Sequence, residues 1–281
     1  MTQVTDLPPV LEREFLSTGA GRWSTAVRRA LPAAVLFVAA LGLWEAVVVL
    51  FRIEGFLLPR PSVIAVTFLR ELPVVTAAGL FTLREAAGGF LLGSLLGIGV
   101  ALATARWTVV SEGLLPFAIA VNSTPIVALA PIMNQWFGIT NPLAKMSIVA
   151  VIVFFPVMIN TVRGLTLVKA EAVELMRSYA AGSFTVLFKL RIPNALPYVF
   201  SAFKVGSTLS VIGAVVSEYF GGSREALGVY LSQQAALFHF AEAWAAIVVA
   251  CLMGIAFYGL ILLVERLLMP WHVSFRNTES A

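Results

Sequence analysis

Long apolar runs, separated by short polar segments, dominate the chain. Residues 86–105, 113–144 and 243–264 contain no charged side chain, and residues 30–51 contain only Glu45. A helix of about 20 apolar residues crosses the hydrocarbon core of a bilayer, so each run is long enough to span a membrane. The pattern predicts an all-α integral membrane protein with several spans.

The apolar runs also predict the number of spans. Residues 113–144 are too many for one span, and the turn residues of FGITNP (137–142) divide them. Residues 57–80 mix apolar and charged positions, and we expect a helix at the membrane interface there rather than another span. Six transmembrane helices are therefore predicted, near residues 30–51, 82–105, 113–136, 142–163, 195–217 and 243–264.

Composition and charge support this topology. The chain is 59% hydrophobic and 12% charged, with mean hydropathy +0.93, whereas soluble domains carry about 25% charged residues. Its net charge of +4 comes from basic residues near the ends of the spans, which favours membrane topology over nucleic-acid binding. Twelve of them fall on the side of the N-terminus and six on the other, so both termini are predicted to be cytoplasmic. The predicted parts are a cytoplasmic tail (1–29), a transmembrane domain (30–266) and a second cytoplasmic tail (267–281).

The sequence lacks the motifs of an enzyme. No Gly-x-x-x-x-Gly-Lys-Ser/Thr phosphate-binding loop occurs, so the chain is not expected to hydrolyse ATP itself. His239 and His272 are the only histidines and lie far apart, and Asp6 is the only aspartate. We therefore expect no catalytic residue, no metal site and no cofactor bound by this chain.

One charged, amphipathic segment interrupts the apolar pattern between two predicted spans, VELMRSYAAGSFTVLFKLRIPNALP (173–197). It reads as two short helices, with Gly182 suited to the left-handed conformation that ends the first and Ser183 to capping the second. Pro193 and Pro197 are expected to close the unit before the next span. Its periodicity fits either a helix on lipid headgroups or a docking element for a cytoplasmic partner.

This segment resembles the cytoplasmic EAA loop of binding-protein-dependent ABC importer permeases. In that loop a glycine follows the first glutamate by six residues and a proline follows the glycine by thirteen, a spacing that Glu174 and Pro193 match. Residues 175–176 are Leu-Met instead of Ala-Ala, and Ala180 occupies the place of the glycine. Gly182 lies two residues further on, and we expect this displacement to alter the turn.

Other segments resemble the sulfonate, taurine and nitrate type of these permeases, a group that includes importers of thiamine pyrimidine precursors and riboflavin. The matching segments are LWEAVV (43–48), FLLPRPSVI (56–64), STPIVALAPIMNQWFG (123–138), VVSEYFGG (215–222) and LGVYLSQQA (227–235).

The resemblance implies the type I ABC importer permease (MetI-like) fold in the bacterial cytoplasmic (inner) membrane. It implies three protein partners: a cytoplasmic ABC ATPase dimer that binds ATP and Mg²⁺, a second permease chain, expected to be an identical copy, and an extracytoplasmic substrate-binding protein. The loop at about 168–193 would couple to the ATPase through Glu174, Arg177, Ser178, Ala180, Gly182, Ser183 and Pro193.

Polar residues within spans are candidates for the translocation pathway. Ser and Thr in spans often bond their own backbone, so at least half of these are expected to be structural. Glu218, at the outer end of the fifth span, either meets the binding protein or a neighbouring permease, or is a solvated span end. The pathway candidates are Asn134, Gln135, Ser207, Thr208, Ser210 and Ser217.

Two further features allow two readings each. Gly89, Gly93 and Gly97 share one helix face, where small residues allow close packing either within the chain or between two permeases. Glu45 and Lys204 are ionisable groups within spans, and we favour structural roles for both over a coupling-ion site.

We therefore predict the permease subunit of an ATP-driven importer of a small polar solute. Candidate solutes are a pyrimidine or thiamine precursor, a riboflavin-like compound, a sulfonate or taurine, and nitrate. The list stays broad because, in importers of this kind, a separate binding protein sets most of the selectivity. The alternatives are a gradient-driven secondary transporter or channel, which usually shows internal repeats, and a membrane scaffold that moves no solute.

Overall fold

The computed structural model describes residues 20–106 and 126–270. These residues form helices, turns and loops, and no strand. The chain divides into two compact units, residues 1–63 and 64–281. Most of the third predicted span, 113–136, lies outside the described residues, and only its C-terminal part is seen.

The first unit consists mainly of α2 (Ala20–Leu50), which contains the first predicted span. The carboxylate of Glu45 accepts hydrogen bonds from the backbone N–H of Ser62, at 3.1 Å, and from its hydroxyl group, at 2.8 Å. Ser62 lies in the first turn of α3 (Pro61–Arg106), where N–H groups have no partner within the helix. Glu45 therefore stabilises the start of α3, a structural role.

The helix expected at 57–80 is not separate but is continuous with the predicted span that follows it. The helix α3 runs without a break over 46 residues and contains Pro73. Val75 and Ala78 are buried in a cluster with Leu227, Ala246 and Val249, so one face of this part of the helix packs against the bundle, while most of its other side chains are exposed.

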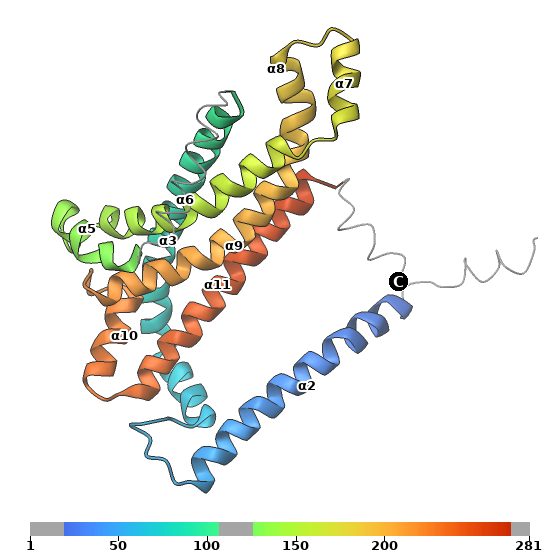
Figure 1. The fold of residues 1–281 in the computed structure, drawn as a ribbon. Coiled ribbons are helices and arrows are strands. Elements are labelled where there is room, and N and C mark those ends of the chain that lie inside the picture. The colour runs from blue at the N-terminus through green and yellow to red at the C-terminus, as the bar shows by residue number, and fades with distance from the viewer. Residues whose placement is uncertain (1–19, 107–125, 271–281) are drawn as a thin grey trace, which may run out of the picture. The chain divides into compact units, whose positions relative to one another are not determined.

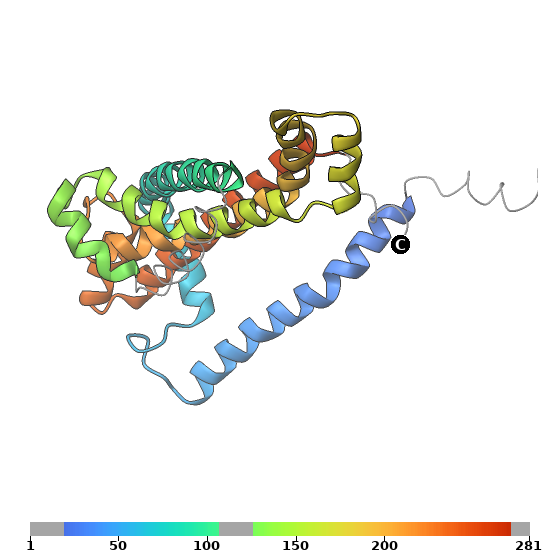
Figure 2. The same ribbon diagram turned by 45° about the horizontal axis from the view of Figure 1, so that its top comes forward.

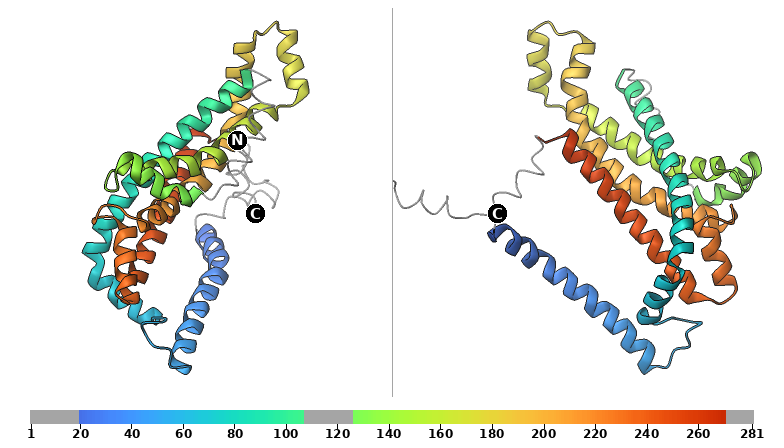
Figure 3. Two further views of the ribbon diagram at one scale, coloured as in Figure 1. Left: turned by 60° about the vertical axis from the view of Figure 1, so that its left-hand side comes forward. Right: turned by 180° about the vertical axis from the view of Figure 1, so that it is seen from behind.

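Three long helices form the centre of the second unit. They are α6 (Pro142–Thr166), α9 (Ile192–Tyr219) and α11 (Phe240–Leu268), with α9 against both of the others (Figures 1 and 3). Phe90 of α3 meets Phe203 and Phe257 edge to face, with ring centroids 5.5 and 5.1 Å apart. These aromatic contacts join α3, α9 and α11 in one apolar core.

Shorter helices lie at the two ends of this bundle. At one end are η1 (Ile126–Leu129), α5 (Ala130–Phe137) and α10 (Leu227–Ala236). At the other end α7 (Ala170–Ser178) and α8 (Ser183–Val186) extend beyond the long helices (Figure 2).

Within the described residues, five helical segments are long and apolar enough to cross a membrane. Large apolar side chains on their outer surfaces are exposed, among them Leu252, Ile255 and Leu263 of α11. A membrane solvates such surfaces with its lipid tails. The five segments are 31–50, 61–104, 142–166, 183–219 and 240–268.

Candidate functional site

The α7–α8 projection comprises residues 168–193, and none of these residues is buried. The sequence predicted two short helices closed by Pro193 and Pro197, but only α7 is a separate helix. The second helix, α8, continues through the π-helical turn η2 (Leu187–Arg191) into α9, and this helical segment extends over residues 183–219.

The π-turn explains why Pro193 does not end the helix. A proline inside an α-helix lacks an N–H group, and its ring clashes with the carbonyl of the residue four positions earlier. For Pro193 that residue is Lys189, which lies within η2. The wider π-turn accommodates the ring, and such turns are frequent at functional sites.

The turn after α7 differs from the sequence-based expectation. Ala180 adopts the left-handed conformation with φ of 52°, whereas Gly182 has φ of −72° and ψ of 163°. The N–H of Ala181 bonds to the carbonyl of Met176 at 3.0 Å, and the N–H of Ala180 to that of Arg177 at 2.8 Å. This is a Schellman motif, in which the left-handed position is usually glycine.

The expected roles of Gly182 and Ser183 are therefore corrected. The left-handed position is Ala180, the residue that occupies the place of the glycine in the resembling loop. Gly182 is the N-cap residue of α8, and Ser183 is the first residue inside that helix. No side chain caps α8.

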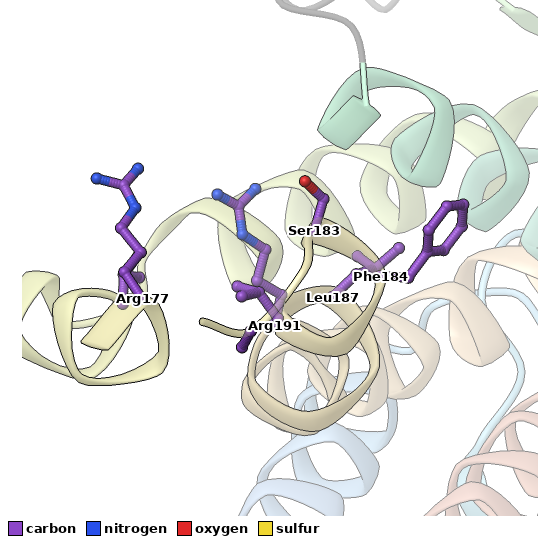
Figure 4. Close-up of a pocket in the computed structure, with 8 residues that line it drawn as sticks. Arg177, Ser183, Phe184, Leu187 and Arg191 are labelled. Carbon is purple, nitrogen blue, oxygen red and sulfur yellow. The ribbon is translucent and has the colours of Figure 1, made fainter. Parts of the chain in front are cut away.

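A cavity of about 280 Å³ lies within the projection, between α7 and the α8–η2 segment (Figure 4). Arg177 and Arg191 bring two guanidinium groups to its wall, beside the apolar side chains of Phe184 and Leu187. The concave surface therefore offers positive charge next to apolar area, a combination that suits the side chains of a partner protein.

The residues expected to couple to a partner are all exposed on this projection. The hydroxyl group of Ser178 donates to the carbonyl of Leu175 at 2.7 Å, so it serves the end of α7. The exposed coupling candidates are Glu174, Arg177, Ser178, Ala180, Gly182, Ser183 and Pro193.

The sequence analysis missed the residue that anchors the projection to the bundle. The side-chain amide of Asn194 donates to the carbonyl of Gly164 at 2.8 Å and to that of Leu167 at 3.1 Å. These carbonyls belong to the end of α6, where no helical partner is available. A Cβ atom at Gly164 would lie 2.6 Å from Cα of Ala195, so the glycine allows α9 to approach closely.

The serine side chains expected along the pathway make hydrogen bonds within the chain. Ser207, Ser210 and Ser217 are buried, and each hydroxyl group donates to the carbonyl three residues earlier. Thr208 bonds to Val205 in the same way but keeps some exposed surface. Gln135 is exposed on α5.

The glycine-rich face of α3 lies against α6. A Cβ atom at Gly89 would meet Val149, one at Gly93 would collide with the carbonyl oxygen of Ala150, and one at Gly97 would lie 2.9 Å from that of Phe154. Glycine at these positions lets the two helix backbones approach closely. In the described chain, this face serves packing between its own helices.

The two remaining ionisable residues singled out from the sequence also lie in internal contacts. Lys204 pairs with Glu265 across α9 and α11. Glu218 is fully buried at the end of α9. A side chain enclosed in this way is not exposed to a binding protein in this conformation, and it is not a solvated span end.

Comparison with known proteins fits this polytopic helical membrane architecture. Residues 89–271 match the family described as the binding-protein-dependent transport system inner membrane component. The riboflavin transport system permease protein of Chloroflexus aurantiacus is 32% identical over 87% of this chain and 91% of its own length. The formylaminopyrimidine transport permease protein of Halalkalibacterium halodurans is 28% identical over 86% of this chain and 96% of its own length.

A solved structure supports the fold alone. The crystal structure of an amino acid ABC transporter with histidines matches with a TM-score of 0.58 at 17% identity, over 72% of this chain and 97% of that one. The chain belongs to the family of binding-protein-dependent transport system inner membrane components. It is thus a multi-pass transport component of the bacterial inner membrane, and its family is one of permeases rather than enzymes.

Proposed function

We propose that the chain is the permease subunit of an ATP-driven importer and forms, with a second copy of itself, the pathway for a small polar solute. A separate cytoplasmic ATPase dimer would bind ATP and Mg²⁺, and an extracytoplasmic protein would deliver the solute. The match over residues 89–271 supports this assignment. Six spans with cytoplasmic tails at 1–29 and 267–281 belong to the proposal, with 113–136 as the remaining span.

The observation that carries the coupling role is the apolar surface of the α7–α8 projection. Leu175, Tyr179, Phe184 and Phe188 are between 56% and 75% exposed. Apolar side chains grouped outside the bundle beside arginines mark a protein contact, and a helix that inserts them into a groove is a recurrent mode of recognition. We assign this surface to the ATPase.

The pathway is proposed along an exposed stripe of α9. Val205, Thr208 and Ile212 recur at spacings of three and four, so they share one face, and each retains exposed surface in the single chain. A second copy that faced this stripe would enclose a channel between the two chains. Gln135 stays a candidate for the pathway because it is exposed, whereas the buried serines serve the helices that surround it.

The stripe favours an uncharged solute. None of its three residues carries a charge, and an anion would need a positive group or oriented donors to compensate its lost hydration. Among permeases that match at least 86% of the chain, those for riboflavin and formylaminopyrimidine are 32% and 28% identical to it, and one for aliphatic sulfonates is 27% identical. A flavin or a pyrimidine precursor is therefore the first candidate, and a sulfonate, taurine or nitrate is the second, on similarity to permeases of those names.

Reconstitution tests the transport proposal. The chain is placed in liposomes with the ATPase and the binding protein of the same organism, and uptake of labelled riboflavin, pyrimidine precursor, taurine and nitrate is measured. Uptake that needs ATP and the loaded binding protein supports the proposal. Uptake driven by an ion gradient without the ATPase would favour a secondary transporter, and ATPase binding without any uptake would favour a scaffold.

A charge reversal tests the coupling surface. Arg177→Glu should reduce the amount of ATPase that co-purifies with the chain by at least tenfold, because it places a negative charge beside the cavity of the projection. Arg224→Glu is the matched control, since Arg224 is also exposed but precedes α10 at the opposite end of the bundle. Equal co-purification by both variants would exclude the projection as the docking site.

A further inference from the structure

A buried polar cluster lies at the end of α9 opposite the projection. Glu218 of α9 is fully buried, Glu85 of α3 is 3% exposed, and Lys145 of α6 is 1% exposed. Removing three ionisable groups from water is costly unless their charges balance and their hydrogen bonds are made. The contacts of each group therefore show which charges are present.

Glu218 fastens the start of α10 to the bundle. Its Oε2 atom accepts from the hydroxyl group of Thr82 at 3.0 Å and from the N–H of Gly228 at 2.7 Å. The Thr82 hydroxyl in turn accepts from the N–H of Leu227 at 2.9 Å. Both N–H groups belong to the first turn of α10, where they lack helical partners. One carboxylate oxygen of Glu218 is thus fully used.

Lys145 supplies the positive charge of the cluster. Its Nζ atom donates to Oδ1 of Asn134 at 2.7 Å and to the carbonyl of Ile139 at 2.6 Å. Lys145 and Glu218 both border Gly222, where an added Cβ atom would lie 3.4 Å from Cε of Lys145 and 3.8 Å from Cα of Glu218. The facing groups are therefore Thr82 and Glu85 from α3, Lys145 from α6, Glu218 from α9, and two backbone N–H groups from α10.

The two carboxyl groups leave one oxygen each without a conventional partner. Oε2 of Glu85 and Oε1 of Glu218 are buried and, among the described residues, accept from no donor. Glu85 lies one helical turn after Thr82 on α3, and the Thr82 hydroxyl group donates to Glu218, so the two carboxyl groups lie on the same side of α3. Two ionised carboxylates can only accept, and they repel, whereas a protonated carboxyl group can donate to an ionised one. One ammonium also balances only one of two carboxylates.

We propose that Glu85 and Glu218 form a buried proton-binding site that holds one proton between them at neutral pH and so keeps α10 docked on α3 and α9. With the proton bound, one neutral carboxyl group donates to one carboxylate, and that carboxylate balances Lys145. Release of the proton to water leaves two carboxylates facing each other against one ammonium group. The contacts that hold the first turn of α10 are then weakened.

Infrared spectroscopy of the full chain in lipid nanodiscs tests the site. At neutral pH the wild-type chain should show the C=O stretching band of a protonated carboxyl group, shifted in D₂O. Glu85→Gln and Glu218→Gln should each lose it, because the remaining carboxylate then pairs with Lys145 alone. Glu225→Gln should retain it, since Glu225 is exposed before α10. Absence of the band in the wild type, or its persistence in either Gln variant at Glu85 or Glu218, would overturn the proposal.

A titration of the wild-type chain gives a second test that needs no variant. An exposed glutamate loses its proton at about pH 4.3. The band of the shared proton should persist when the solution is brought from that pH to neutral pH. A band that disappears in the range of exposed glutamates would show that no proton is held, whatever the stability of the variants.

Discussion

The ammonium group of Lys204 on α9 lies 3.0 Å from Oε2 of Glu265 on α11 and 3.1 Å from Oε1, so one lysine bridges both oxygens of one carboxylate. The Glu265 side chain is 5% exposed and that of Lys204 is 24% exposed. The pair therefore joins two neighbouring helices in a place where neither charge is well hydrated.

Breaking this ion pair from one side should destabilise the protein. Lys204→Met leaves Glu265 buried without its counter-charge, a change that costs about 3–5 kcal/mol in buried pairs. The double variant Lys204→Met/Glu265→Leu removes both charges and should recover most of that loss. Thermal unfolding of the three proteins in detergent measures the effect, and equal losses in the single and double variants would contradict it.

Neither of two substitutions in the turn after α7, one at Ala180 and one at Gly182, should destabilise the projection. Ala180→Gly removes the left-handed strain of an L-residue, about 1–2 kcal/mol, less the greater chain entropy of glycine in the unfolded state. Gly182→Ala should be neutral or stabilising, because its φ and ψ suit alanine and nothing lies within 4 Å of the added Cβ atom. Protease resistance of the projection reports both changes, and destabilisation by Ala180→Gly would refute the assignment of the turn.

The contact of α3 with α6 gives a prediction with a control in the same helix. Gly93→Ala places a methyl group against the backbone of Ala150 and should cost about 1–3 kcal/mol by overpacking. Gly99→Ala enters open space and should instead gain up to about 1 kcal/mol in helix propensity. The unfolding temperatures of the two variants test this prediction. A shift of the same sign in both would mean that α3 does not pack closely against α6 at Gly93.

Asn194 should matter for the attachment of the projection. Asn194→Ala removes two hydrogen bonds to the end of α6 and should cost about 1–3 kcal/mol, since it leaves partly buried carbonyls without a donor. We expect faster hydrogen exchange of α7 amides in this variant, with little change at α10. Asn141→Ala is the comparison, because Asn141 bonds only the neighbouring Leu143 N–H at the start of α6. Uniform exchange changes throughout the bundle would speak against an anchoring role.

The shared proton has a consequence for stability. In the unfolded chain both carboxyl groups are ionised above about pH 4.3, so at neutral pH the folded chain binds one proton more than the unfolded chain. Stability should therefore fall as pH rises, by up to about 1.4 kcal/mol per pH unit while the proton stays bound. Glu85→Gln should flatten this dependence relative to Glu225→Gln. Identical pH profiles for the wild type and Glu85→Gln would contradict the prediction.

The sequence predicted the all-α membrane architecture and the family, because long apolar runs and ordered motifs are local signals. The predicted spans at 142–163, 195–217 and 243–264 each fall within an observed helix. Pro193 misled the prediction, since a proline breaks a regular α-helix but is accommodated here by a π-turn.

The buried cluster was beyond the reach of sequence patterns. Thr82 and Glu218 are separated by 136 positions, and a glutamate at the end of a span looks the same whether it meets water or another helix. Only the approach of α3, α6, α9 and α10 brings Glu85, Lys145 and Glu218 together. Asn194 was missed for a similar reason, because its partners lie 27 and 30 residues earlier.

The helical segment 183–219 is unbroken and connects the two ends of the second unit. At 1.5 Å per residue it is about 55 Å long, with Phe184 near one end and Glu218 near the other. A stiff rod transmits a tilt at one end to the other without any intervening signal. Bending is easiest where the hydrogen-bond ladder is irregular, which here includes η2 and Pro197, so this part of the helix sets how much of a displacement at the projection reaches the other end.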